Sequence, residues 1–307
     1  MTSACQHGVQ RCIAAVGMFD GVHLGHSFVV RTVCDQGRQR GLTPLLITFL
    51  THPIASLRPG SEPTALTSAQ QRSHLLQELG AERVELLDFN RIRKLKAEEF
   101  LEMLHHDYGV DVLIMGFNNR IGCDLRPASE LKPRYGNVEI ITLKPRPGGD
   151  DISSSAIRKA VASGRVEEAA MMLGRPYTLC GTVVSGRQLG RTIGFPTANI
   201  VPLLHNAAVP AGGVYAADIS IGNNPQTQRA MVNIGTRPTV GGHHCTIEAH
   251  IIGFDGDLYG HTLNVAFLKR LRDERRFDSL DQLRSQLLAD REEAMTLTQP
   301  CETRFHL

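Results

Sequence analysis

The first half of the chain alternates between short apolar runs and segments with helical spacing of apolar residues. Each run is rich in Val, Ile and Leu, and the segments between them place apolar residues three or four positions apart. Such alternation predicts βαβ units and a parallel sheet. The predicted strands are 12–19, 44–50, 83–89, 111–117 and 137–143.

Helix boundaries can be predicted at several points of this half. Thr67 and Gln70 fit a capping box that opens a helix over 68–79, and the segment 97–106 forms a second helix without interior Gly or Pro. Two further helical stretches follow the last strand, at 153–164 and 166–174.

Beyond about residue 178 the texture of the sequence changes. Strand-like runs are separated by clusters of Gly, Asn and Pro at spacings of 10 to 20 residues, which is typical of an antiparallel barrel or sandwich. We therefore expect two domains, 1–178 and 179–307. The strand-like runs are 177–185, 213–221, 229–235, 246–254 and 262–268.

The last segment of the chain predicts a helix. Leu280, Leu283 and Leu287 share one helical face, and Ser279 with Gln282 fits a capping box at its start. A helix after a run of strands is compatible with a barrel that carries one covering helix.

Composition excludes several classes of protein. The chain has 307 residues, 42% of them hydrophobic, and a formal net charge of +2, which is ordinary for a globular protein. The basic stretch 268–276 alternates with acids, so we expect no nucleic-acid partner. The seven cysteines form no CxxC pair, so disulfides and zinc knuckles are not expected. Without a secretory signal or a run of about 18 apolar residues, we expect a cytoplasmic protein with no membrane partner.

The stretch 17–26, GMFDGVHLGH, joins the first predicted strand to a helix expected to begin near His26. It lies at the carboxyl end of a strand, where open α/β sheets bind ligands. Gly25 lets the backbone approach a ligand, the helix start favours an anion, and the imidazoles of His23 and His26 can donate hydrogen bonds to phosphate oxygens. The pattern favours a phosphate site. A zinc site, for which the sequence offers no evident third ligand, and histidines that only pack remain alternatives.

A second candidate for phosphate binding is ISSSAIR, at 152–158, where another helix is predicted to begin. Ser153 and Ser154 can cap this helix or bind a phosphate, and Arg158 can clamp one. Taken alone, a Ser-rich helix start is more often a cap. Its presence after the histidine motif in the same domain makes the pair more specific for phosphate.

A third candidate lies in the second half of the chain. No GxxxxGK[ST] motif is present, which excludes a P-loop kinase. The stretch 185–200, SGRQLGRTIGFPTANI, has a Pro-fixed turn with Thr197 and Asn199, whose side-chain oxygens suit Mg²⁺, and glycines that let a loop fold over phosphates. By composition alone a surface hairpin is the stronger interpretation. The spaced residues are Gly186, Arg187, Gly190, Arg191 and Gly194.

Nearly the whole chain resembles the bifunctional bacterial riboflavin kinase/FMN adenylyltransferases, also called FAD synthetases. The motifs occur in the same order as in that family. The PTAN element within 194–200 is the most specific of them. The similar stretches of the first half are GMFDGVHLGH, ITFLTHP (47–53), ISSSAIR and LGRPY (173–177). Those of the second half are GFPTANI (194–200), GGVYAA (212–217), VNIGTRPTVGG (232–242), IEAHI (247–251), FDGDLYG (254–260) and LRDERRFDSLDQL (271–283).

For the first half, the resemblance implies a Rossmann-like nucleotidyltransferase domain that transfers AMP from ATP to FMN and releases pyrophosphate. His23 and His26 would stabilise the charge that builds on the α-phosphate, while Ser154 and Arg158 would hold the β and γ phosphates. The other positions that the resemblance assigns to ATP are Gly17, Phe19, Asp20, Gly25 and Ser153, and those that it assigns to flavin are Asn118 and Arg120.

For the second half, the resemblance implies a six-stranded antiparallel β-barrel riboflavin kinase domain with a C-terminal helix. This domain would transfer the γ-phosphate of ATP to the 5′-hydroxyl of riboflavin. Thr197 and Asn199 would bind Mg²⁺ with ATP, and Glu248 would accept the hydroxyl proton, although strand alternation alone predicts only an outward-facing Glu248. Asp255 and Asp257 are better explained as turn residues. The positions that the resemblance assigns to ATP here include Gly186, Gly190 and Gly194, and those for flavin are Arg272 and Phe277.

Departures from the family pattern concern the adenylyl-transfer site. One alternative is therefore a riboflavin kinase with a weakened or lost adenylyltransferase step. A second alternative is a flavin-binding regulator without turnover, and a nucleotidyltransferase with a single activity would leave the barrel unexplained. The family's Asn after the first Gly is Met18, its Glu-Pro before His52 is Leu50 and Thr51, and in GFNNRIG (116–122) Asn118 replaces an acid and Ile121 an aromatic.

Overall fold

A computed structural model of the chain describes residues 10–144, 152–186, 190, 193–239 and 242–298. They fall into two compact units, of which one is Met1–Pro63 with Thr67–Ser153 and the other is Thr64–Leu66 with Ser154–Leu307. The boundary between the two packing units thus lies before residue 154, because the helices of 154–173 share the core of the second unit. The boundary between the two functional domains, expected near residue 178, stays a prediction.

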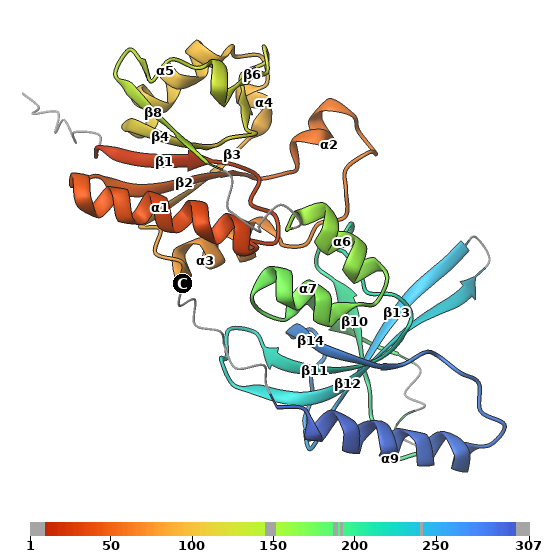
Figure 1. Cartoon of the computed structure of the whole chain (residues 1–307). Coiled ribbons are helices and arrows are strands. Elements are labelled where there is room, and N and C mark those ends of the chain that lie inside the picture. Colours follow the sequence, from red (N-terminus) through yellow and green to blue (C-terminus); the bar gives the residue numbers. More distant parts are fainter. Residues whose placement is uncertain (1–9, 145–151, 187–189, 191–192, 240–241, 299–307) are drawn as a thin grey trace, which may run out of the picture. The chain divides into compact units, whose positions relative to one another are not determined.

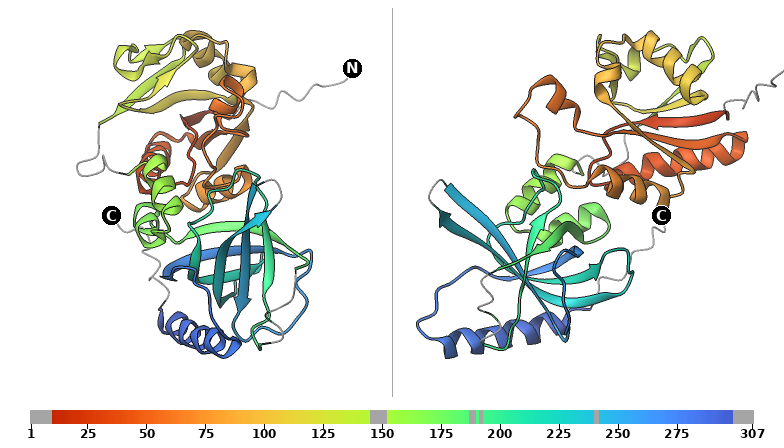
Figure 2. Two further views of the ribbon diagram at one scale, coloured as in Figure 1. Left: turned by 90° about the vertical axis from the view of Figure 1, so that its right-hand side faces the viewer. Right: turned by 180° about the vertical axis from the view of Figure 1, so that it is seen from behind.

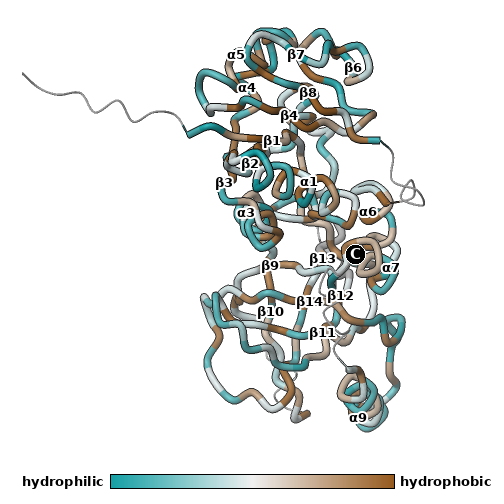
Figure 3. The backbone as a smooth tube through the Cα atoms, turned by 60° about the vertical axis from the view of Figure 1, so that its left-hand side comes forward, coloured by the Kyte–Doolittle hydropathy of each residue, from teal (hydrophilic) through white to brown (hydrophobic). Residues whose placement is uncertain are grey.

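The first unit contains a twisted sheet of six strands (Figure 1). Five strands run parallel, as the sequence predicts, and only the short β7 is antiparallel to its neighbour. The parallel strands are hydrophobic along most of their length (Figure 3), as expected for strands covered on both faces. In spatial order they are β3 (Arg83–Leu87), β2 (Thr43–Phe49), β1 (Cys12–Val16), β4 (Val110–Gly116), β8 (Val138–Leu143) and β7 (Arg134–Tyr135).

Helices cover both faces of this sheet (Figure 1). On one face Ile13 packs with Val33 of α1 and Leu76 of α3, and on the other Ala14 packs with Leu104 of α5. This confirms the α/β Rossmann-like expectation. The helices are α1 (Leu24–Arg40), α2 (Pro53–Leu57), α3 (Ala69–Glu78), α4 (Phe89–Ile92) and α5 (Ala97–Tyr108), and smaller elements are β5 (Arg120–Ile121), β6 (Arg126–Pro127) and a 3₁₀ turn (Ala128–Glu130).

Two predicted helix starts of this unit are wrong by one or two residues. Helix α3 is capped by Ser68 in a capping box with Gln71, one residue after the predicted Thr67 and Gln70. The shift has a physical reason, because the Thr67 hydroxyl is engaged elsewhere. Helix α1 begins at Leu24 rather than near His26.

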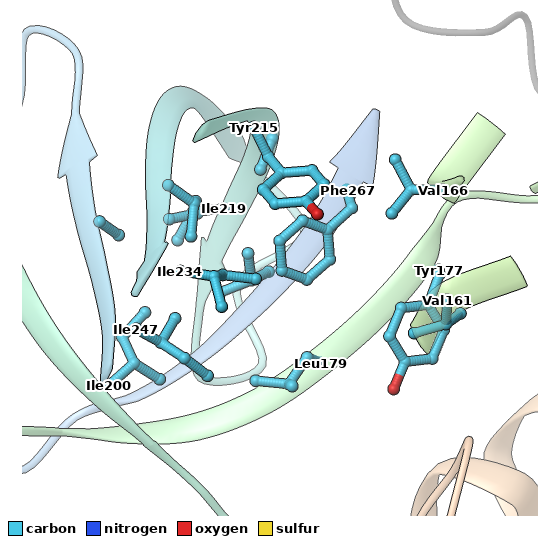
Figure 4. Close-up of a cluster of buried hydrophobic side chains, with 14 of the residues drawn as sticks. Val161, Val166, Tyr177, Leu179, Ile200, Tyr215, Ile219, Ile234, Ile247 and Phe267 are labelled. Atoms are coloured by element: carbon cyan, nitrogen blue, oxygen red, sulfur yellow. The ribbon is translucent and has the colours of Figure 1, made fainter. Parts of the chain in front are cut away.

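The second unit is a closed barrel of six antiparallel strands, seen from two sides in Figure 2. Its interior is a single apolar cluster in which Tyr215, Phe267 and Ile234 point toward one another (Figure 4). The expected barrel with a C-terminal helix is confirmed. In spatial order the strands are β10 (Ala198–Pro202), β13 (Gly242–Ile251), β12 (Thr227–Thr239), β11 (Gly213–Ile221), β14 (Thr262–Arg272) and β9 (Tyr177–Val184), and the helices are α6 (Ser154–Ala162), α7 (Val166–Leu173) and α9 (Leu280–Thr296).

Helix α9 lies against the outer face of the barrel and is fixed there by charged side chains. Asp290, only 3% exposed, accepts hydrogen bonds from Nε and Nη2 of Arg272 at 3.0 and 2.8 Å. Arg229 donates to the carbonyls of Ala294 and Leu297 at the carboxyl end of the helix. These contacts hold α9 against the barrel wall.

Candidate active sites

The loop that follows β1 lies at the point where the strand order of the first unit reverses. The chain moves from β1 to β2 on one side, while β4 pairs with the other side of β1. Ligands of open α/β sheets bind in the crevice at such a switch point, outside the carboxyl ends of the strands. The segment 17–23 and the start of α1 therefore occupy the expected position of a binding loop.

This loop has an unusual backbone. Phe19 and Val22 adopt positive φ angles of 49° and 40°, and Gly21 has φ 80°. A non-glycine residue in this region costs of order 1 to 3 kcal/mol and persists only where surrounding contacts impose it. Phe19 is 4% exposed, and its ring meets the ring of His26 edge-on, with the ring centroids 5.2 Å apart. Phe19 thus supports the loop from inside, and its expected contact with ATP stays a prediction.

A buried hydrogen-bond network imposes the shape of the loop. Asp20, 2% exposed, accepts hydrogen bonds from the backbone N–H and the hydroxyl of Thr67 at 3.0 and 2.9 Å. The same hydroxyl oxygen accepts from the N–H of Gly21 at 3.0 Å. The carboxylate of Asp20 is therefore turned toward Thr67, and its expected role in phosphate binding stays a prediction.

Arg72 of α3 lies behind the same loop and is 1% exposed. Its guanidinium donates to the Thr48 hydroxyl at 3.0 Å and to the carbonyls of Phe49 and Thr67. Burial lowers the pKa of Arg72, and the negative charge of Asp20 opposes this shift. A buried arginine thus joins the ends of β2 and α3 to the loop that carries the histidines.

The two histidines stack on each other at the start of α1. Their ring centroids are 3.6 Å apart, and Nδ1 of His23 accepts a hydrogen bond from the N–H of His26 at 3.3 Å. A neutral His23 therefore carries its proton on Nε2, so the ring presents a donor in addition to the N–H groups of the helix start. The described residues contain no group of three or more His, Cys, Asp or Glu side chains placed to hold a metal ion. The arrangement favours phosphate over zinc.

A cavity of about 640 Å³ adjoins this loop in the first unit. Its wall includes Gly17 at the end of β1, the rings of Phe49 and Phe89, and the polar side chains of Asn118 and Arg120. A mostly apolar wall with a few polar groups, in this size range, suits a flat organic ligand. The structure thus brings the two predicted flavin residues together with the nucleotide loop.

The departures from the family pattern fall at different places around this cavity. Ile121 lines it, whereas Leu50 is half exposed. The side chain of Met18 packs against the apolar core, and its backbone carbonyl accepts a hydrogen bond from Thr48 at 2.9 Å. His52 caps α2 through Nδ1. Met18 therefore contributes its backbone to the loop, which a change of side chain leaves in place.

The serine-rich motif lies at the boundary of the two units. Ser153 closes the first unit, while Ser154 begins α6 in the second. Nε of Arg158 donates to the carbonyl of Thr64 at 2.6 Å, within the second unit. The expected roles of these residues toward the β and γ phosphates stay predictions.

In the second unit, two described glycines lie close to the PTAN turn. A Cβ atom on Gly186 would overlap the side-chain amide of Asn199, so only glycine allows this close approach. A Cβ atom on Gly190 would likewise overlap the carbonyl of Phe195. Gly194 has φ 83°, while Arg187 and Arg191 lie outside the described residues. The described glycines Gly186 and Gly190 thus lie directly against the PTAN segment, and the role of this stretch in ATP binding stays a prediction.

Glu248 stands in the middle of a polar row on the outer face of the barrel. In β13 it lies opposite Asn199 of β10 on one side and opposite Asn233 of β12 on the other. Its neighbours Ile247 and Ala249 are 3% and 1% exposed and face the interior. Because opposed residues of paired strands project to the same face, the three polar side chains lie side by side.

A second cavity, of about 380 Å³, lies next to the PTAN turn in the barrel. Thr197 and Ala198 form one side of it, and the segment 254–259 forms another. Within that segment Asp257 accepts a hydrogen bond from the N–H of Tyr259 at 2.9 Å, as a turn residue does. Thr197, which the sequence predicts to bind ATP, therefore lines this cavity.

His250 supports the same turn from the outer face of β13. Its Nδ1 lies 2.8 Å from the carbonyl of Pro196, which makes Nδ1 the protonated nitrogen of the neutral ring. Its ring also packs against Phe195, with ring centroids 5.1 Å apart. Burial lowers the pKa of His250, the hydrogen bond to Pro196 opposes this shift, and the charge of Arg291 adds to it.

The two residues expected to bind flavin near the end of β14, Arg272 and Phe277, contact each other. The guanidinium carbon of Arg272 lies 5.7 Å from the ring centroid of Phe277, and that of Arg275 lies 4.7 Å from it. Because Arg272 also pairs with Asp290, it has a structural role. Direct contact of Arg272 and Phe277 with flavin stays a prediction.

Comparison with known proteins agrees with this two-unit architecture. The FAD synthetase family model matches residues 5–156, and the riboflavin kinase family model matches residues 173–298. The bifunctional riboflavin kinase/FMN adenylyltransferase of Escherichia coli (strain K12) is 35% identical over 296 residues, which cover 94% of this chain and 93% of that protein. Its Bacillus subtilis (strain 168) counterpart is 33% identical over 297 residues, covering 93% and 92%. The chain belongs to the bifunctional riboflavin kinase/FMN adenylyltransferase family.

A solved structure from Streptococcus pneumoniae, described as a macrolide-efflux protein, has the same fold. It is 35% identical, covers 94% of this chain and 95% of its own, and superposes with a TM-score of 0.84. None of the helices in the described segments of the present chain is long and apolar enough to cross a membrane. The relatives from Escherichia coli and Bacillus subtilis are named for two flavin activities. The chain is accordingly a transferase of FAD biosynthesis with kinase and adenylyltransferase domains.

The sequence alone does not reveal the roles of several residues of this bifunctional enzyme. Arg72 stabilises the histidine loop, as does Thr67, which the sequence predicts only as a helix cap, and Asn233 and His250 flank the kinase motifs. The sequence does indicate that Arg72 is buried. It precedes Leu76 by four residues and therefore lies on the apolar face of its helix. Nothing in the sequence pairs Asn233 with Glu248, because that contact depends on strand register.

The Thr67 network predicts a selective defect. Thr67→Val keeps the shape of the side chain but removes both hydrogen bonds of the hydroxyl, at a cost of about 1 to 3 kcal/mol for buried partners. We expect FAD formation from supplied FMN to slow by about tenfold or more, while FMN formation from riboflavin keeps its rate. Chromatography of the products measures both rates. The control is Thr32→Val, because Thr32 bonds only within α1 among the interactions described here. Unchanged FAD formation in Thr67→Val would contradict the role of the network.

The lowered pKa of His250 predicts a pH dependence of the barrel's stability. Between this lowered pKa and the ordinary value of 6.5, the unfolded chain binds more protons than the folded one, so the free energy of unfolding falls as the pH drops below about 6.5. His250→Gln keeps an N–H donor for Pro196 and does not titrate. We expect urea denaturation, followed by circular dichroism at pH 7.5 and 5.5, to show a smaller loss in the variant. An equal loss in both proteins would refute this assignment.

Proposed function

We propose that the chain converts riboflavin to FMN in its second unit and FMN to FAD in its first, using ATP with Mg²⁺ at both sites. The observation that carries this proposal is that each unit has a cavity beginning at its own phosphate motif. The larger cavity adjoins Gly17 and the histidine loop, and the smaller one adjoins Thr197. Two separate pockets beside two phosphate motifs fit two consecutive transfers.

In the adenylyl-transfer step, a phosphate oxygen of FMN attacks the α-phosphorus of ATP and pyrophosphate leaves. The isoalloxazine ring would lie in the larger cavity, near Asn118 and Arg120. His23, His26 and the N–H groups of the α1 start would stabilise the charge that develops on the α-phosphate. The Asp20–Thr67 hydrogen bonds keep this loop preorganised, so catalysis is by positioning and electrostatics without a covalent intermediate.

In the kinase step, the 5′-hydroxyl of riboflavin attacks the γ-phosphorus of ATP and ADP leaves. Glu248 would orient this hydroxyl and accept its proton. Phosphoryl transfer passes through a loose transition state in which orientation of the nucleophile matters more than the strength of the base. The carboxylate is well placed for this, because the strand register fixes it between Asn199 and Asn233.

The residues near the PTAN turn fit a magnesium ion held mainly by phosphates. Thr197 and Asn199 offer hard oxygen atoms, and Gly186 leaves room for the Asn199 side chain next to the backbone. When bound, Mg²⁺ would neutralise charge on the β and γ phosphates. Because ATP is its substrate, we place the enzyme in the cytoplasm.

Two variants test the division of labour between the units. Glu248→Gln should lower FMN formation by about 100-fold or more, because it removes the proton acceptor, and should still convert supplied FMN to FAD. His26→Ala should form FMN and accumulate it. Chromatography of products from riboflavin and MgATP measures both outcomes, and each variant is the control for the other. Full kinase turnover by Glu248→Gln would exclude Glu248 as the base.

A further inference from the structure

The side chain of Glu274 extends the polar row of the kinase site beyond Asn233. Glu274 follows β14, yet its Oε1 accepts a hydrogen bond from Nδ2 of Asn233 on β12 at 3.4 Å. Its carboxylate rests on the backbone of Gly235, where a Cβ atom would come within 2.6 Å of Oε1. Glycine at position 235 therefore makes room for this carboxylate.

The strand register places this carboxylate on the acceptor side of Glu248. Asn233 is directly opposite Glu248, with Cβ atoms about 4.5 to 5.5 Å apart in such pairs. The PTAN strand, with Asn199, flanks Glu248 on the other side. Since the phosphate donor is assigned to the PTAN side, the molecule that receives the phosphate has to approach from the side of Asn233 and Glu274. In-line transfer places the attacking hydroxyl and the leaving oxygen of ADP on opposite sides of the γ-phosphorus.

The segment that carries Glu274 is anchored before and after it. Asp273 pairs with Nη2 of Arg270 at 2.8 Å, and Arg272 is held by the buried Asp290. On its other side, the neighbouring Arg275 donates a hydrogen bond to the side chain of Gln286 on α9. The carboxylate is thus exposed to solvent but held at a fixed place, which is a property of a substrate-positioning group.

We propose that Glu274 positions the ribityl chain of riboflavin, with Asn233 holding its carboxylate. One carboxylate oxygen accepts from Asn233, and the carboxylate also accepts a hydrogen bond from a ribityl hydroxyl close to the 5′ position. The chemistry fits, because the ribityl chain carries further hydroxyl groups next to the reacting 5′-hydroxyl. Each of them can donate a hydrogen bond, and an ionised carboxylate only accepts hydrogen bonds. This inference rests on the proposed role of Glu248, which fixes where the 5′-hydroxyl lies.

Kinetics of Glu274→Ala test the proposal. We expect the KM for riboflavin to rise about tenfold, as for loss of one hydrogen bond to a charged group, while the KM for MgATP and the rate of FAD formation from FMN stay unchanged. Riboflavin analogues that lack the 2′-, 3′- or 4′-hydroxyl locate the contact. The native enzyme should discriminate against one of them by about tenfold, and Glu274→Ala should discriminate against it much less.

The matched control is Glu292→Ala, which removes an exposed carboxylate from α9 in the same unit. An unchanged KM for riboflavin in Glu274→Ala would overturn the inference. So would a raised KM for MgATP or a changed Mg²⁺ requirement, since either would assign the carboxylate to the metal. The same holds if the variant discriminates among the analogues as the native enzyme does. Failure of the proposed function itself looks different, because Glu248→Gln would then retain kinase turnover.

Discussion

The register of three neighbouring strands is the constraint on which the kinase site depends. Strand β13 lies between β10 and β12, so Glu248 has Asn199 on one side and Asn233 on the other. A slip of one residue in either pairing would turn Glu248 or its partners into the barrel interior, which buried residues such as Ile247 and Ala249 fill. The apolar core of the barrel therefore fixes the positions of polar groups on its outer face.

The adenylyl-transfer site depends on a different constraint. Its loop has positive φ angles at Phe19 and Val22, and buried partners of Asp20 keep it in this shape. In both units, residues proposed to bind phosphate lie at the end of a strand or the start of a helix, where a sheet supports them. Each unit has its own set of such residues, which fits two separate transfers.

Much of this architecture could be predicted from the sequence. The alternation of apolar runs predicts the parallel sheet, and the strand-like runs beyond residue 178 together with the family resemblance predict the barrel. The sequence could not reveal the roles of Thr67 and Arg72, because hydrogen bonds to distant residues decide them. Thr67 fits the pattern of a helix cap, but its hydroxyl bonds to Asp20 and Ser68 caps the helix. Likewise, only the register shows that Asn233 belongs beside Glu248.

A crystal structure of the full chain with riboflavin, Mg²⁺ and a non-hydrolysable ATP analogue would show whether Glu248 faces the reacting hydroxyl. We predict that the 5′-oxygen of riboflavin lies within hydrogen-bond distance of the Glu248 carboxylate, about 2.5 to 3.0 Å, with the triphosphate on the side of Asn199. A riboflavin molecule bound with its 5′-hydroxyl away from Glu248, or a triphosphate on the side of Asn233, would contradict it.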